Sequence, residues 1–477
     1  MASSDVSEIG SERRAARTVA PPRSTGRVTR PLAITRRAGA ATATALAART
    51  YRRVRRDEQV AARWEARTAQ HLADGLGEMR GAVMKLGQLV SYLDHRVPEH
   101  LRASLAALQE DAPRMAAELV DEVVEAELGA PPAHLFARWD PDPIAAASIG
   151  QVHRAVAHDG RAVAVKVQYP GIDEAVRSDL AMLRPLLLPL RALAPRLDIT
   201  AIAEEVRTRV SEELDYRREA ANQQRFARAF AGHPHLHVPA VYEDLSSDRV
   251  LSTELVAGHR TSEAATWSAA ERDLAGASLY RFVASSLYDH GLLHGDLHPG
   301  NLRFHGQGRI SVLDFGLIRV CTPSERDIQE RTLRAWTAGE ADELLAVLGT
   351  AGYLPSAGPD LVEAAEAHFA SLSPLLGADE ERTVRPADAA ALVDVYLDER
   401  FDHLRQGGTI PGPLVFHHRL NLGLHAVLGA LGARANWRRI SAESWPWDRS
   451  PAPGPLGAAH DRWRRGAADR TDPGAHR

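Results

Sequence analysis

The stretch HGDLHPGNLRFHGQGRISVLDFG, residues 294–316, decides the fold. Asp296 and Asn301 lie five residues apart in its first part, where a Pro-Gly step interrupts helix and sheet. A short apolar run, residues 310–313, then leads directly to Asp314, as a buried strand would. The stretch therefore predicts a loop and a strand end that bring two carboxylates and one amide together.

These three polar side chains suit phosphoryl transfer. The reaction needs a carboxylate that orients the attacking hydroxyl, and it needs oxygen ligands for Mg²⁺. We expect Asp296 to be the catalytic carboxylate, and Asn301 and Asp314 to hold the metal ion. An ordinary loop rich in glycine and proline is the alternative, but such a loop does not require Asp-Phe-Gly at this separation.

Lysine usage points to two further residues. Lys85 and Lys166 are the only lysines among 58 basic residues, and all the others are arginine. Arginine is not equivalent to lysine where a compact ammonium must meet a phosphate. Both lysines are therefore candidates for the catalytic machinery, with chance retention as the alternative.

A β-hairpin is expected around Lys166. Two strand-like runs flank an Asp-Gly turn at residues 159–160, and Lys166 lies near the end of the second run. In kinases, a lysine on such a strand contacts the nucleotide phosphates. Where kinases have a glycine-rich loop, this chain has small residues, namely Ala145, Ala146, Ala147 and Ser148. Their Cβ atoms restrict the backbone, so we expect altered nucleotide handling without loss of binding.

A kinase-like lysine also needs a carboxylate to hold it. The candidates are Glu213 and Glu219, which lie with Asp215 in a charged stretch, residues 200–230, that is predicted to form one long helix. Asp215 and Glu219 share a helix face and Glu213 is offset from it, so spacing does not select the partner of Lys166. A solvated helix face is the alternative for each of the three acids.

Composition narrows the possible classes of protein. The net charge of −4 argues against nucleic-acid binding, and the single cysteine, Cys321, excludes an intramolecular disulfide framework. No apolar run is long enough for a transmembrane helix, and no secretory signal is visible, so we expect a cytoplasmic protein. The arginine-rich N-terminus would suit an anionic membrane surface, and a solvated basic tail is the simpler alternative.

The fold class expected from these patterns is α+β, with a small β-rich lobe and a larger helical lobe. Glu254 and Val256 lie in a strand-like run that resembles the hinge between such lobes, where backbone groups meet an adenine. The expected divisions are a disordered tail at 1–38, a helical extension at 39–135, a small lobe at 136–256, a helical lobe at 257–445 and a flexible tail at 446–477.

Together these motifs resemble the UbiB/AarF/ADCK family of atypical, protein-kinase-like proteins. The motifs that carry the resemblance, in the family's order, are Lys85-Leu-Gly-Gln88, Ala145-Ala-Ala-Ser148, Val163-Ala-Val-Lys166, Glu213-Leu-Asp215 with Glu219, His294 to Asn301, and Asp314-Phe-Gly316. The chain differs from the family pattern at Leu297, where proline is common, and in the run before Lys85, which lacks Gly-Pro.

The resemblance implies a role for each matching position. Lys166 would contact the α- and β-phosphates of ATP or ADP and pair with Glu219, while the alanine-rich loop would cover the phosphates. Lys85 would lie close to Glu213 and Asp215, in an extension thought to block protein substrates. The family is associated with ATP binding, Mg²⁺, weak ATPase or unorthodox kinase activity, and isoprenoid-quinone or other lipid metabolism at membranes.

Two other functions are compatible with the same motifs. A small-molecule phosphotransferase of the aminoglycoside or choline kinase type fits the loop from His294 to Asn301, but fits Asp314-Phe-Gly and Lys85 less well. A nucleotide-gated, lipid-binding scaffold with little turnover need not keep Lys166, Asp296 and both metal ligands. The sequence does not define the phosphate acceptor, the lipid ligand or the oligomeric state.

Overall fold

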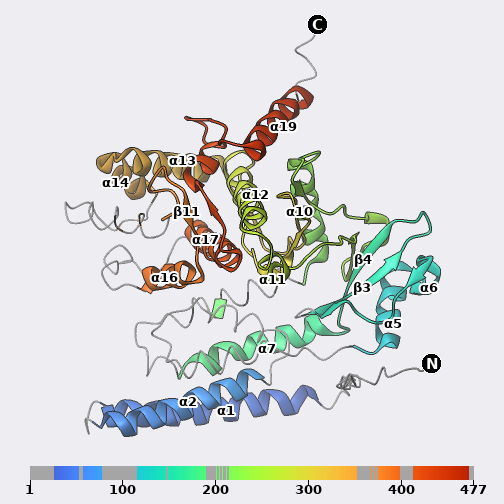
Figure 1. The fold of residues 1–477 in the computed structure, drawn as a ribbon. Coiled ribbons are helices and arrows are strands. Elements are labelled where there is room, and N and C mark those ends of the chain that lie inside the picture. Colours follow the sequence, from blue (N-terminus) through green and yellow to red (C-terminus); the bar gives the residue numbers. More distant parts are fainter. Residues whose placement is uncertain are drawn as a thin grey trace, which may run out of the picture.

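The computed structural model describes residues 26–52, 57–77, 115–146, 149–189, 214–351, 374–397 and 412–471, with single positions between 200 and 211 and between 367 and 370. These residues form a small lobe, a larger helical lobe and a pair of long N-terminal helices (Figure 1). The two-lobed α+β architecture expected from the sequence is confirmed.

The N-terminal helices α1 (Gly26–Thr50) and α2 (Glu58–Gly77) pack against each other and along α7 (Ile172–Leu187). Their contact is lined by small side chains, and Thr68 Oγ1 donates a hydrogen bond of 2.8 Å to Thr44 Oγ1. Helix α1 begins inside the segment 1–38 that we expected to be disordered. That boundary is too late, because apolar residues such as Ile34 are buried against α7, a surface that composition does not reveal.

The small lobe is built on an antiparallel sheet in the order β1-β3-β4-β6, with β2 paired to the edge of β3. Valines 163, 165 and 167 of β4 are fully buried against α5, so the strand's alternation turns Lys166 to the opposite face. Its strands are β1 (Arg138–Trp139), β2 (Ala145–Ala146), β3 (Gly150–Val156), β4 (Ala162–Gln168) and β6 (Val250–Glu254), and its helices are α5 (Ala117–Leu128), α6 (Pro132–Leu135) and the short η3 (Glu243–Leu245).

The helix that carries Glu219 is α10 (Tyr216–Ala229). It begins after a turn at Leu214, so the single helix predicted for residues 200–230 is wrong. Asp215 is the N-cap of α10, because its Oδ1 accepts a 2.9 Å hydrogen bond from the backbone N–H of Arg218. An aspartate satisfies a helix-terminal N–H better in this position than inside a helix, which explains the break.

The large lobe surrounds α12 (Ala269–Tyr288), which is buried from Ala275 to Leu287. The candidate site residues Asp296, Asn301 and Asp314 lie in the segments that join short strands, and two of these strands pack on this helix. The other helices are α11 (Thr261–Ala264), α13 (Pro323–Ala338), α14 (Ala341–Thr350), α16 (Pro386–Leu397), α17 (Gly412–Leu431), α18 (Trp437–Ala442), α19 (Pro455–Thr471) and the short η4 (Pro299–Asn301). The strands are β5 (Leu236–His237), β7 (Leu292–His294), β8 (Leu302–Phe304), β9 (Ile310–Val312), β10 (Ile318–Val320), β11 (Arg382–Thr383) and β12 (Arg434–Ala435).

The connection after Asp-Phe-Gly is short. Strand β10 follows at once and pairs antiparallel with β7, the strand that leads into residues 295–301, which we call the catalytic loop after its predicted role. Helix α13 then starts at Pro323, where Thr322 and Glu325 form a reciprocal capping box. No long activation loop separates Gly316 from α13 in this continuously described part of the chain.

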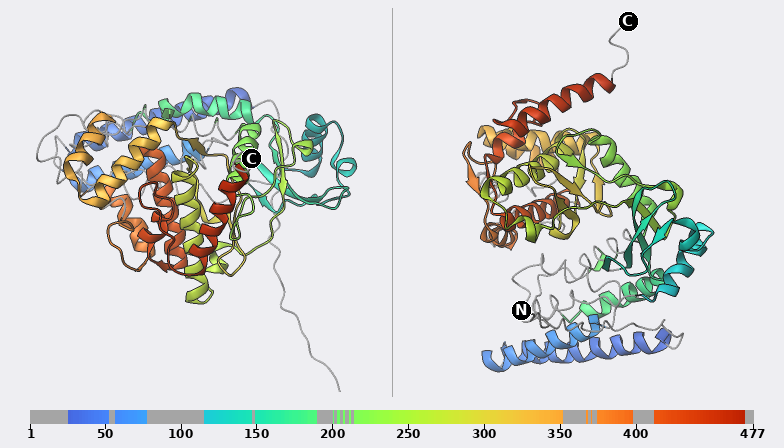
Figure 2. Two further views of the ribbon diagram at one scale, coloured as in Figure 1. Left: turned by 90° about the horizontal axis from the view of Figure 1, so that it is seen from above. Right: turned by 45° about the vertical axis from the view of Figure 1, so that its right-hand side comes forward.

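The C-terminal segment is ordered as far as α19, so a flexible tail over 446–477 is wrong for most of its length. His460 Nδ1 lies 3.0 Å from His233 Nε2, and Trp463 stacks on Phe230. These side chains fix α19 to the large lobe, at the end of the molecule opposite to α1 and α2 (Figure 2). Across the described ranges, no helix is both long and apolar enough to span a membrane.

Candidate active site

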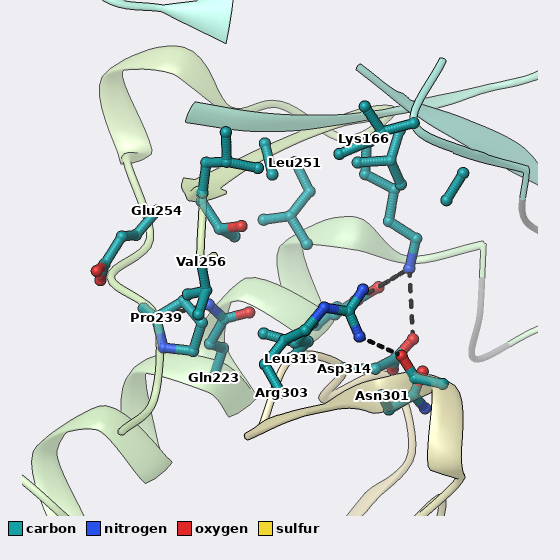
Figure 3. A pocket seen from close by; sticks show the side chains of 18 of the residues that line it. Lys166, Gln223, Pro239, Leu251, Glu254, Val256, Asn301, Arg303, Leu313 and Asp314 are labelled. Atoms are coloured by element: carbon teal, nitrogen blue, oxygen red, sulfur yellow. Dashed lines mark hydrogen bonds and ion pairs between the residues drawn. The ribbon is translucent and has the colours of Figure 1, made fainter. Parts of the chain in front are cut away.

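A cavity of about 530 Å³ lies between the two lobes (Figure 3). Its small-lobe wall includes Ile149, Val152, Ala164 and Leu251, so it is mainly apolar. Its opposite wall carries most of the charged groups, which are described below. The volume is in the range of typical small-ligand sites.

Lys166 enters the cavity from β4 and meets Glu219 of α10. Its Nζ donates hydrogen bonds of 3.0 and 2.9 Å to the two carboxylate oxygens of Glu219, which is 4% exposed. Burial disfavours the charged form of Lys166, but the carboxylates of Glu219 and Asp314 outweigh this effect and raise the pKa of Lys166 well above its usual value. The structure thus selects Glu219 among the acids that spacing left open.

Asp314 lies two residues after the end of β9 and faces this pair. Its Oδ2 is 3.9 Å from Lys166 Nζ, and its Oδ1 accepts a 2.9 Å hydrogen bond from the backbone N–H of Gly316. A Cβ at position 316 would lie 3.3 Å from Asp314 Oδ1, so glycine lets the backbone approach the carboxylate closely. The Asp-Phe-Gly sequence therefore orients its own aspartate through a local backbone contact.

The catalytic loop is held by hydrogen bonds among its own residues. Asn301 Nδ2 donates to the backbone oxygen of Asp296 at 3.2 Å and approaches its Oδ2 at 3.4 Å. His294, which is 1% exposed, has Nε2 2.6 Å from the backbone oxygen of Asp314 and accepts the Asp296 N–H at Nδ1, 3.3 Å away. This arrangement requires the proton on Nε2, so His294 joins the backbones of the two acids.

Helix α17 adds two residues that the sequence did not point to. Arg419 Nε donates a 3.1 Å hydrogen bond to the backbone oxygen of Gly295, and Nη2 lies 3.9 Å from Asp296 Oδ1. Gly423 meets the next residue of the loop, because a Cβ there would lie 2.5 Å from the backbone oxygen of Leu297. Both residues are more than a hundred positions from the loop, and no local pattern marks them.

Arg303 is a further cavity residue that sequence reasoning missed. It lies on β8 between buried Leu302 and Phe304, so strand alternation turns it away from the core. Burial, followed by the charge of nearby Arg260, lowers the pKa of Arg303. The alternation apolar, arginine, apolar in the sequence would have predicted this placement.

The other predicted site residues lie apart from the cluster of Lys166, Asp296 and Asp314 or outside the described residues. Ala145 and Ala146 form β2 and line the cavity above the charged groups. Asp215 caps α10 and is not among the residues that line the cavity. Four predicted residues, Lys85, Ala147, Ser148 and Glu213, lie outside the described residues.

Glu254 and Val256 line the expected hinge end of the cavity. The Glu254 side chain points away from Lys166 (Figure 3) and lies 3.1 Å from His237 Nε2, a contact that lowers the pKa of Glu254 and raises that of His237. The Glu254 side chain is thereby engaged outside the cavity. Among the described residues no acceptor takes the backbone N–H of Val256, so that group is available to a ligand.

The donor set fits a nucleotide with Mg²⁺. Asp314 and Asn301 offer a carboxylate and an amide oxygen, the hard ligands that Mg²⁺ prefers, and Lys166 offers an ammonium beside them. In the described ranges no group of three or more histidine, cysteine, aspartate or glutamate side chains could hold a metal ion by itself. Mg²⁺ bound partly through nucleotide phosphates needs no such group.

Comparison of this sequence with known proteins identifies one family of kinase-like proteins. A model described as the ABC1 atypical kinase-like domain matches residues 107–348. AarF domain-containing protein kinase 1 of Mus musculus is 32% identical over 267 residues, which cover 54% of this chain and 51% of that protein. An uncharacterized protein of Synechocystis sp. is 34% identical over 280 residues, covering 58% of this chain and 41% of that protein. The chain thus spans about half the length of these curated relatives or less.

A solved structure also resembles this chain. The complex of Rv3197 with erythromycin from Mycobacterium tuberculosis matches with a TM-score of 0.57 and 29% sequence identity. The match covers 83% of this chain and 100% of that chain. The bilobal, kinase-like fold predicted from the sequence is confirmed by this likeness and by the family match.

Proposed function

Because the chain belongs to the ABC1 atypical kinase-like family, we propose that it binds ATP or ADP with Mg²⁺ and acts as an atypical kinase or ATPase. One observation carries this proposal. Lys166, paired with buried Glu219, lies within 3.9 Å of Asp314 in the same cavity that contains Asp296 and Asn301. A protein that only bound a ligand would not need all of these groups.

The geometry supports a separate role for each of these side chains. Lys166, oriented by its hydrogen bonds to Glu219, would bind the phosphates. Asp314 and Asn301 would hold Mg²⁺, which would neutralise charge on the transferred phosphoryl group. Asp296 would orient the attacking hydroxyl or water and accept its proton. Arg419 and His294 would act as positioning residues, since each contacts the loop or strand that carries an acid.

The alanine-rich loop and Lys85 belong to the same proposal. Ala145 and Ala146 would cover the phosphates from the small-lobe side, and Val256 would offer its N–H to the base. Lys85, from the extension that precedes the small lobe, would approach the acids near α10 and restrict access for protein substrates. Substitution of Lys85 by arginine would then change nucleotide affinity although the charge is kept.

A link to isoprenoid-quinone or other lipid metabolism is the finer part of this proposal. The arginine-rich N-terminus, with a composition suited to an anionic surface, supports it. An anionic membrane surface is accordingly the proposed partner, and no nucleic-acid partner is proposed for a chain of net charge −4.

A small-molecule phosphotransferase is the second candidate. The observation that favours it is the likeness to Rv3197, whose structure was solved with erythromycin, a small organic molecule. A nucleotide-gated scaffold with little turnover is the third candidate. The three candidates differ in what happens to the γ-phosphate. It passes to water or to the acceptor of an atypical kinase in the first, passes to a small molecule in the second and stays on the nucleotide in the third.

The decisive experiment measures Mg²⁺-dependent ATP turnover by the whole chain, with and without anionic liposomes, and in a parallel reaction with erythromycin. Asp296→Asn is the test variant, and Asp327→Asn, an exposed change on α13, is the matched control. We expect turnover that falls about 10²- to 10⁴-fold in Asp296→Asn and is unchanged in Asp327→Asn. A rise with liposomes supports the membrane link, and phosphorylated erythromycin, detected by mass spectrometry, supports the second candidate. Tight nucleotide binding without any turnover contradicts the enzyme proposal.

A further inference from the structure

Arg303 reaches the cavity from the large lobe. Its neighbours on β8, Leu302 and Phe304, are fully buried in the large-lobe core, and Arg303 is paired across the strands with Ser311. Phe304 also exchanges two backbone hydrogen bonds of 2.9 Å with His259, just after the hinge. The strand that carries Arg303 is therefore fixed both to the core and to the hinge.

The guanidinium is held in place but keeps free donors. Its Nη1 donates hydrogen bonds of 3.1 Å to the backbone oxygen of Gly300 and 2.8 Å to that of Leu302. Nε and Nη2 donate to no acceptor within the described part of the chain. In Figure 3 the Arg303 side chain extends into the space between Val256 and Asp314. Val256 marks the expected hinge end of the cavity, and Asp314 marks the end with the proposed Mg²⁺ ligands.

Among the described residues Arg303 forms no ion pair, although the charge of Glu263 acts on it and opposes the fall in its pKa. Glu219 and Asp314 lie beside Lys166, and Arg419 lies beside Asp296. No carboxylate of the described residues lies within ion-pair distance of Arg303. A half-buried cation that faces a cavity attracts an anionic ligand, and a guanidinium matches the oxygens of a phosphate in a bidentate arrangement.

On the small-lobe wall, Lys166 is the one positively charged side chain among the described residues that line the cavity. The described loop residues of this wall, Ala145 and Ala146, carry no charge and pair with Val152 and Gln151 of β3. The backbone there is also more restricted than in a glycine loop that wraps around phosphates. A nucleotide with several phosphate charges would thus meet its second cation on the large-lobe wall.

We propose that Arg303 is a phosphate-binding residue, which holds the polyphosphate of the nucleotide from the large-lobe side and complements Lys166 on the small-lobe side. This inference rests on the proposed function, because it requires that the cavity binds a nucleotide. Arg303 lies outside the predicted catalytic residues, and it would contact the phosphates from the lobe opposite to Lys166.

The test compares a nucleoside with its phosphorylated forms. Binding of adenosine, ADP and ATP in Mg²⁺ is measured by calorimetry for the unchanged chain, Arg303→Gln, Arg303→Lys and Arg309→Gln. Arg309 is an exposed arginine on the same β-hairpin, so it controls for loss of a positive charge. Thermal unfolding of each variant shows whether the fold is kept.

We expect Arg303→Gln to weaken ADP and ATP about 10- to 100-fold, the usual effect of losing hydrogen bonds to a charged group, and to leave adenosine binding unchanged. Arg303→Lys should recover part of the loss, and Arg309→Gln should match the unchanged chain. Equal losses for adenosine and ATP, or no loss in Arg303→Gln, would overturn the inference while the proposed function stands. If the unchanged chain binds none of the three ligands, the proposed function fails, and the inference fails with it.

Discussion

The large-lobe wall of the cavity is fixed by buried contacts from several elements, whereas the described part of the small-lobe loop above it is a strand of two exposed residues. On the large-lobe side, His294, Arg419 and Gly423 hold the backbone around Asp296 from β7 and α17. On the small-lobe side, Ala145 and Ala146 pair only with the edge of β3.

The difference in support between the two walls matches two different tasks, which are to orient reacting atoms and to cover a ligand. Groups that orient reacting atoms must be placed within a fraction of an ångström, which calls for rigid support. Groups that cover a ligand must let it enter and leave, which calls for a lightly held loop. We therefore expect substitutions in the large-lobe wall to reduce turnover strongly, and substitutions in the small-lobe loop to change affinity modestly.

The largest effect is expected from Asp314→Asn. Removal of the carboxylate charge should abolish the Mg²⁺ dependence of ATP binding, because an amide is a much weaker Mg²⁺ ligand. Titration of ATP with and without Mg²⁺ checks this result, with Asp327→Asn as the exposed control. ATP affinity that still depends on Mg²⁺ as in the unchanged chain would show that Asp314 is not a ligand.

A large effect is also expected from Gly423→Ala. Its Cβ would lie 2.5 Å from the backbone oxygen of Leu297, so the catalytic loop or α17 must move. A displacement of about 1 Å can lower turnover about 10²-fold. Gly349→Ala in α14 is the matched control, because a Cβ there meets no atom within 4 Å. That variant should be neutral or slightly more stable. Normal turnover in Gly423→Ala would mean that the loop does not depend on α17.

An intermediate effect concerns the acid stability of the large lobe. Burial lowers the pKa of His425 on α17 to about 4, so the unfolded chain binds more protons than the folded chain between pH 6.5 and 4. Stability should consequently fall as the pH drops through this window, by up to about 3 kcal/mol from this residue. Thermal unfolding from pH 7 to 4 should show a smaller fall in His425→Asn than in the unchanged chain. His134→Asn, an exposed change, should not alter the slope.

The smallest effect is expected from Ala146→Gly in the small-lobe loop. The added backbone freedom costs about 0.5–1 kcal/mol when the loop is ordered over a ligand. ATP affinity should therefore weaken about two- to fivefold, and the rate at saturating ATP should stay the same. A fall in that rate comparable to the Gly423→Ala effect would remove the distinction between the two walls.

The sequence was sufficient to predict those parts of the molecule whose structure depends on residues close together in the chain. The catalytic loop, the strand that leads to Asp314 and the hairpin that carries Lys166 each follow from such residues. Arg419 was out of reach, because its contact with Gly295 spans 124 positions and depends on the packing of α17. Asp215 was assigned to the site by resemblance, although an N-cap fits the same residue.

The described residues near both ends, 26–38 and 446–471, also differ from the prediction for a physical reason. Composition suggested disorder for residues 1–38 and 446–477, but Ile34 and Trp463 each find an apolar or aromatic surface on another element. Such contacts supply the burial that an isolated segment lacks. The positions of Lys85, Ala147, Ser148 and Glu213 remain predictions.

The short connection from Asp-Phe-Gly to β10 and α13 has a consequence for the time course of the proposed ATP turnover. In kinases with a long segment at this point, an order–disorder transition there can delay or gate the reaction. Here β10 pairs with β7 directly, so the free energy that aligns Asp314 with the catalytic loop is part of the free energy of folding of the large lobe. We accordingly expect the proposed ATP turnover to be linear from the moment of mixing, without a lag phase and without prior covalent modification between Gly316 and α13.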